Sequence, residues 1–133
     1  MKHLDAGEAG VDRYAAGMQV RRQVLGDVHV DRATSATTDF TRDFQHLITE
    51  YAWGSIWTRP GLDRRSRSMI TLTALVARGH HEELAMHIRA ARRNGLTVDE
   101  IIGGYYRQVG VVWNGGRSLA TLTAQGAVVE AAR

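Results

Sequence analysis

Apolar side chains recur at helical spacing through the middle of the chain. Between residues 38 and 51 they fall at positions i, i+4, i+7, i+8 and i+11, one face of an amphipathic helix: Phe40, Phe44, Leu47, Ile48 and Tyr51. Thr38 or Asp39 is suited to cap the start of this helix. We expect residues 53–62, with their glycines, two tryptophans and the single proline, to interrupt it. His46 lies opposite the apolar face, so we expect it in solvent.

The segment before residue 38 carries weaker signals. Residues 14–26 (YAAGMQVRRQVLG) predict a short helix that ends at Gly26, because glycine is favoured just past a helix C-terminus. We expect residues 27–38 to form a loop. Residues 1–13 are polar and rich in glycine, so we expect them to be poorly ordered.

Four further helices are predicted after the proline. One begins at Asp63, and its residues 68–77 (SMITLTALVA) are apolar on nearly every side, which indicates a central, buried helix. β-branched content also suits a strand there, but the length and the charged lead-in favour a helix. Gly79 is expected to end the helix that begins at Asp63. Residues 81–94 predict the next helix, which Asn94 and Gly95 close, and Thr97 with Glu100 forms a capping box that opens another. With a final helix over 118–132 and no hairpin signal, the predicted fold class is all-α, with about five to six helices.

Length and composition restrict the class of protein. The 133 residues suit a single domain with one hydrophobic core. No run approaches the roughly 20 apolar residues of a membrane span, and the N-terminus has no apolar signal segment, so we expect the cytoplasm and no membrane partner. The absence of cysteine excludes disulfides, thiolate metal sites and cysteine nucleophiles.

The charged residues indicate a small acidic ligand rather than nucleic acid. The net charge is only +3, acidic residues are interspersed, and no nucleic-acid-binding motif appears. Lys2 is the only lysine, so a Schiff base would depend on the chain terminus. The arginines suit bidentate contact with carboxylates, in a substrate or across subunits.

The segment HHEELAMH, residues 80–87, concentrates the candidate chemistry. On a helix that begins by His80, the side chains of His80, Glu83 and His87 share one face, and His81 and Glu82 point away. A carboxylate one turn before an imidazole raises the histidine pKa, so His87 is a candidate proton donor or acceptor near neutral pH. Two other interpretations stay open: a solvated ion pair on the helix face, or a His/Glu metal site, whose spacing matches no standard motif.

Residues 17–101 resemble the carboxymuconolactone decarboxylase family. The motifs that carry the resemblance are YAWG (51–54), RPGLDRR (59–65) and RRNG (92–95). The family implies a compact orthogonal helix bundle of the alkylhydroperoxidase D-like type, assembled as a homo-oligomeric trimer or hexamer. The redox branch of that fold carries two cysteines and a histidine, where this chain has His80, Glu83 and His87. Thiol peroxidase chemistry is therefore not expected.

The resemblance implies cofactor-free decarboxylation of 4-carboxymuconolactone to the β-ketoadipate enol-lactone in aromatic catabolism. No cofactor is expected because the lactone itself accepts the electron pair that carbon dioxide leaves behind. His87, oriented by Glu83, is the expected general acid. The expected substrate contacts are an arginine on the second carboxylate, with Arg64 ahead of Arg59, Arg65 and Arg67, and a dry pocket wall formed by Tyr51, Trp53 and Trp57. His80 is a further expected substrate-binding residue. Structural ion pairs and core packing are the alternative roles of these arginines and aromatic residues.

The resemblance ends after Ile101. The family continues with an acidic, apolar helix and a turn that contains proline, whereas this chain has Gly103-Gly104, then Trp113-Asn114-Gly115-Gly116, and no proline after residue 60. The alternative function is therefore that of a catalytically altered or silent member, an oligomeric binding protein for a related lactone acid.

Overall fold

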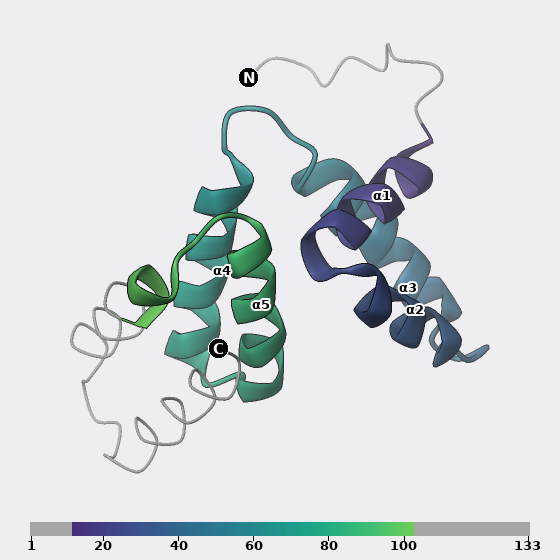
Figure 1. The fold of residues 1–133 in the computed structure, drawn as a ribbon. Helices are drawn as coiled ribbons and strands as arrows, with labels where there is room; N and C mark the ends of the chain where they lie inside the picture. The colour runs from purple at the N-terminus through teal and green to yellow at the C-terminus, as the bar shows by residue number, and fades with distance from the viewer. Residues whose placement is uncertain (1–11, 103–133) are drawn as a thin grey trace.

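The computed structural model describes residues 12–102, and the regular elements in that range are all helical. They are α1 (Arg13–Leu25), α2 (Asp27–Ser35), α3 (Arg42–Ile48), the π-helix η1 (Thr49–Ile56), α4 (Arg64–Arg78) and α5 (His81–Arg93). The predicted all-α class is confirmed. Figure 1 shows α4 and α5 side by side, with α1, α2 and α3 gathered as a second group. The expectations for residues 1–11 and 103–133 lie outside the described residues.

The first predicted helix is confirmed, and the loop predicted after it is wrong. Gly26, with φ of 87°, ends α1 and turns the chain directly into α2. Arg22 near the end of α1 pairs with Asp27 at 3.1 Å and with Asp31 at 2.8 Å, and Val30 is completely buried. The β-branched residues of this segment do not favour a helix. The contacts with α1 stabilise α2 nevertheless, because burial outweighs local helix propensity.

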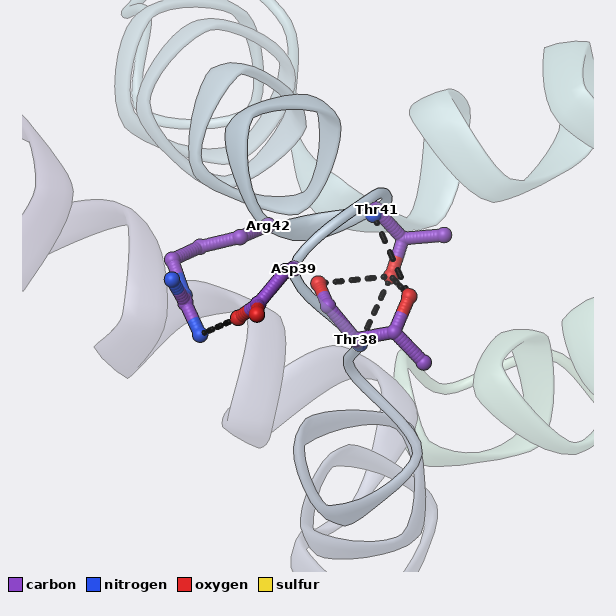
Figure 2. A network of polar contacts seen from close by, with 4 residues as sticks. All are labelled: Thr38, Asp39, Thr41 and Arg42. Carbon is purple, nitrogen blue, oxygen red and sulfur yellow. Dashed lines mark hydrogen bonds and ion pairs between the residues drawn. The ribbon is translucent and has the colours of Figure 1, made fainter.

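The predicted cap of α3 is displaced by one turn. Figure 2 shows that Thr38 and Thr41 bond to each other: the Thr38 amide donates to Thr41 Oγ1 at 3.0 Å, and the Thr41 amide donates to Thr38 Oγ1 at 3.4 Å. Asp39 instead pairs with Arg42. Thr38 to Thr41 therefore form a turn of their own, since serine and threonine hydroxyls compete for nearby backbone amides, and α3 begins only at Arg42.

The helix also continues past the predicted interruption at residue 53, as η1, to Ile56. The glycine that predicts a break allows close packing instead. A Cβ built on Gly54 would lie 2.1 Å from the Arg13 carbonyl oxygen, and one on Gly17 would lie 2.2 Å from that of Thr49. Two glycines, one on each helix, thus let the backbones of α1 and η1 approach closely. Residues 57–63 form the connection from η1 to α4.

The apolar face predicted for residues 40–51 does not form the core of the described chain. Phe40, Phe44 and Tyr51 are 95%, 60% and 61% exposed, and Leu47 is 58% exposed. The buried side of the following η1 passes instead through Thr49 and Trp53. A π-helix bonds from i to i+5, so η1 does not keep the register of α3 before it. His46 is exposed as predicted, and its ring lies 4.5 Å from that of Tyr14.

The helix predicted from Asp63 is confirmed, but its burial is one-sided. The Asp63 carboxylate accepts the Ser66 amide at 2.7 Å, and Gly79, with φ of 72°, ends α4. Leu72, Leu75 and Val76 are buried, whereas Ile70 is 59% exposed. The expectation of a helix buried on nearly every side is therefore wrong for the described chain.

Helix α5 joins two core clusters. Leu84, Ile88 and Ala91 pack with Leu72 of α4 and its buried neighbours. Ala90, on a different side of α5, packs with the cluster of α1, α2 and η1 that includes Trp53. His87 therefore lies on a helix held from two directions.

The end of α5 and the capping box that follows it also agree with the predictions. Asn94 and Gly95 close α5. Thr97 Oγ1 accepts the Glu100 amide at 3.1 Å, and the Glu100 carboxylate accepts the Thr97 amide at 2.9 Å, so the capping box is confirmed. Within residues 12–102, no helix is long and apolar enough to cross a membrane.

Candidate functional site

Helix α5, which carries Glu83 and His87, begins at His81. The predicted face shared by His80, Glu83 and His87 requires a helix that begins one residue earlier, at His80. His80 precedes α5 with φ of −81° and ψ of 81°, and is exposed. His80 is therefore not on the helical face of Glu83 and His87. These two remain one turn apart on α5, which keeps their side chains on the same face.

Burial controls the acidity of His87 in the free protein. Desolvation by burial lowers the pKa of His87, the nearby His29 lowers it further, and the carboxylate of exposed Glu83 raises it. The net direction is downward, so the expected rise from Glu83 is outweighed. The cause is that Glu83 acts from solvent, where charge interactions are screened, whereas the imidazole itself is largely removed from water.

A basic hollow of about 270 Å³ lies between the end of α1, α2 and α5. We call it the α2–α5 hollow; its walls are Leu25, Val28, His29, Arg32, Met86, Arg89 and Arg93. His87 and Glu83 are not among its lining residues, but His29 in its wall is close enough to His87 to lower the pKa of that imidazole. Burial and then the cationic Arg21, Arg32, Arg89 and Arg93 lower the pKa of His29. Three guanidinium groups and no carboxylate among the lining residues make this hollow attractive to an anion.

Sequence reasoning missed the lining of this hollow. His29 and Arg32 were expected in a loop, whereas in α2 they stand at i and i+3 on one face. Arg89 and Arg93 stand at i and i+4 on α5. The helical spacing of Arg89 and Arg93 was a usable signal. The pairing of His29 with Arg32 gave no usable signal, because these residues share a face only if α2 is helical.

The other predicted substrate contacts lie elsewhere. Arg64 Nη2 donates to Gln23 Oε1 of α1 at 2.7 Å, and the exposed Arg59 offers its carbonyl to Arg67 at 2.8 Å. Tyr51 faces solvent, and Trp53 is 6% exposed. The lining of the α2–α5 hollow includes none of these four predicted substrate contacts, which are Arg64, Arg59, Tyr51 and Trp53. Their contacts with substrate stay predictions.

Core packing accounts for the tryptophans in the described chain. The rings of Trp53 and Trp57 lie 5.1 Å apart at an interplanar angle of 31°, and both belong to the cluster that joins α1, η1 and α5. Among residues 12–102, no three histidine, aspartate or glutamate side chains are grouped so as to hold a metal ion.

Known proteins similar to this chain agree with the motifs. The sequence model of the carboxymuconolactone decarboxylase family matches residues 42–104. A 4-carboxymuconolactone decarboxylase of Pseudomonas putida is 60% identical over 42 residues, which are 32% of this chain and 88% of that relative. This chain belongs to the carboxymuconolactone decarboxylase family.

Two longer relatives are equally similar to this chain. A 4-carboxymuconolactone decarboxylase of Acinetobacter baylyi is 48% identical over 89 residues, 67% of this chain and 66% of the relative. A nitrosuccinic acid decarboxylase of Metarhizium robertsii is 48% identical over 85 residues, 64% of this chain and 59% of the relative. In both cases the matched part spans less than two thirds of the relative's length.

Proposed function

We propose that this protein is a carboxy-lyase that decarboxylates 4-carboxymuconolactone to the β-ketoadipate enol-lactone, without a cofactor. Family membership and relatives named as decarboxylases support this reaction class. The observation that carries the proposal is the basic α2–α5 hollow, whose wall includes His29, a close neighbour of His87. A lactone dicarboxylate needs cations for its carboxylates, which the arginines of the hollow offer, and a proton for its carbon, a role that we assign to His87.

The electron pair has a defined course in this reaction. When carbon dioxide leaves the ring carbon beside the lactone oxygen, the pair delocalises through the ring alkene onto the lactone carbonyl. Guanidinium groups at the hollow stabilise the resulting oxyanion. His87 then donates a proton to the carbon next to the carbonyl, which gives the enol-lactone, and regains a proton from water.

His87 acquires its proton together with the substrate. Burial favours the neutral imidazole in the free protein. A dianion in the α2–α5 hollow raises the pKa of His87, because opposite charge favours the protonated form. Glu83 adds a smaller push in the same direction, so we assign it a positioning and electrostatic role rather than direct contact.

The test is steady-state decay of 4-carboxymuconolactone with purified protein. We expect His87→Ala to lose about 100-fold or more in kcat, and the matched control His81→Ala, on the same helix, to keep it. Arg89→Gln should raise KM, whereas Arg92→Gln, an exposed arginine outside the hollow, should not. Equal kcat in wild type and His87→Ala would remove His87 from the mechanism.

A second substrate is favoured by the relative that acts on another acid. Nitrosuccinic acid, like the lactone, is a dicarboxylic acid that carries its own electron acceptor, here a nitro group beside the carbon that loses carbon dioxide. The same hollow and the same proton donor suit both reactions. Comparison of kcat/KM on the two acids decides between them, and ligand-dependent melting shifts without turnover of either would favour a binding protein.

Self-association is part of the proposal. The apolar side chains of Phe40, Phe44, Leu47 and Tyr51 are exposed on α3 and its ends, and a patch of this kind suits an interface between copies. We expect a trimer or hexamer by light scattering, and a smaller species for Phe44→Ser. The cytoplasm stays the expected compartment.

A further inference from the structure

Helix α1 buries a positive charge that has no negative partner among residues 12–102. Arg21 is 7% exposed. Its Nη1 donates to Thr49 Oγ1 at 3.0 Å, and its Nη2 donates to Gln45 Oε1 at 3.2 Å. Its Nε is buried and has no hydrogen-bond partner among the residues that the structure describes. Both partners are neutral, and no ion pair to Arg21 occurs in the part of the chain that the structure describes.

The neighbouring arginine has the environment that Arg21 lacks. Arg22 is half-exposed and pairs with both Asp27 and Asp31. Burial lowers the pKa of Arg21, Tyr14 acts against that effect and Arg22 adds to it, and no carboxylate of residues 12–102 is among the causes. Since buried charges in proteins are normally paired, an unpaired guanidinium destabilises the chain and needs a reason.

A second hollow, of about 310 Å³, is lined by this guanidinium. We call it the Arg21 hollow. It lies between α1, α2 and the α3–η1 segment, and the polar residues in its wall include Tyr14, Thr34, Thr37, Arg42 and Gln45. It shares no lining residue with the α2–α5 hollow. Its volume lies at the lower end of the range for small-molecule sites, about 300–1,000 Å³.

The charges of this hollow favour a single carboxylate group. Arg42 is the second cation in the wall, and it already pairs with Asp39, whose side chain is 92% exposed (Figure 2). The uncompensated charge is therefore close to that of one guanidinium. The hydroxyl groups of Thr34 and Tyr14 supply neutral donors around it, whereas the Thr37 hydroxyl already donates to the Ala33 carbonyl.

We propose that the Arg21 hollow is a binding site for a small carboxylate, separate from the proposed decarboxylation site. The carboxylate neutralises the buried Arg21 and receives further hydrogen bonds from the hydroxyl-bearing wall. Arg42 stands at the exposed edge and contributes attraction from there. The site rests on the burial and pairing of Arg21, so it does not depend on the proposed reaction.

The experiment is a titration of full-length protein with acetate and propionate, followed by calorimetry and by the melting temperature, with sodium chloride at matched ionic strength as the blank. We expect saturable binding and a rise in Tm for wild type and for the control Arg22→Gln. Arg42→Gln should weaken binding severalfold, and Arg21→Met by at least about tenfold. Without ligand, Arg21→Met should be as stable as wild type or more so, because it removes an unpaired buried charge.

Three results would overturn the proposal. They are no saturable binding to wild type, unchanged binding in Arg21→Met, and tighter binding of inorganic phosphate than of either carboxylate. If Arg21→Met does not fold, Arg42→Gln decides: a carboxylate affinity equal to that of Arg22→Gln contradicts the site, and a selective loss supports it.

Discussion

Replacing Gly17 by alanine tests the close approach of α1 and η1. The new Cβ would lie 2.2 Å from the Thr49 carbonyl oxygen and 2.7 Å from the Gly54 amide nitrogen. A relaxed carbon–oxygen contact is about 3.3–3.6 Å, so the two backbones must separate by about 1 Å. Both obstructing atoms belong to the backbone, so no side-chain rotation removes the clash.

Two effects of opposite sign set the magnitude. Overpacking that forces a backbone shift costs about 1–3 kcal/mol, and the separation also loosens Val20, Val24 and Trp53, which share a cluster across the contact. Alanine in a helix is favoured over glycine by about 1 kcal/mol. We therefore expect Gly17→Ala to lose about 1–2 kcal/mol and to lower Tm by roughly 3–10 °C.

The assay is urea and thermal unfolding followed by circular dichroism. Gln19→Ala and Gln19→Gly, at an exposed position of the same helix, measure the alanine–glycine difference without a clash, and alanine should be the more stable there. If Gly17→Ala also proves as stable as wild type or more so, the close contact between α1 and η1 does not exist as described.

Three other predictions concern the core, the capping box at Thr97 and the titration of the half-buried His29 and His87. Leu84→Ala, at a position 1% exposed, should lose about 2–5 kcal/mol in urea unfolding; a loss below that range would mean that α4 and α5 are loosely packed. Thr97→Ala should cost about 1 kcal/mol, because it removes the hydroxyl that accepts the Glu100 amide, and a neutral effect would contradict the capping box. Burial lowers the pKa of His29 and of His87 in the folded chain, so the unfolded chain takes up protons first, and stability should fall as the pH drops below about 6.5. His29→Gln should flatten that fall in urea midpoints measured across the window, and a protein that gains stability on acidification would refute the assignment.

Local chemistry made several elements predictable from the chain alone. Gly26, Gly79 and Gly95 end helices with positive φ, as their positions predict, and Asp63 caps α4 as expected. The box formed by Thr97 and Glu100 closes within four residues. Each of these features depends on contacts between near neighbours, which sequence order already brings together.

The failed predictions concern segments whose structure depends on distant contacts. The helix α2 forms where its residues favour a loop, because Val30 is buried and Arg22 of α1 pairs with its aspartates. The glycine expected to break the helix at residue 54 serves instead as a contact point for α1. Spacing along one helix does not reveal which other helix approaches it.

Some features of the candidate site were likewise predictable from the sequence, and others depend on contacts between helices. The sequence by itself determined the family motifs and the one-turn separation of Glu83 and His87. Only the tertiary structure decided that His87 is buried enough to lower its pKa, and that His29 and Arg32 of α2 join Arg89 and Arg93 of α5 around one hollow. The tertiary structure also decided that Arg21 is buried with no acid paired to it among residues 12–102. The physical reason is that helical periodicity sets which residues share a face, whereas desolvation and charge pairing depend on what packs against that face.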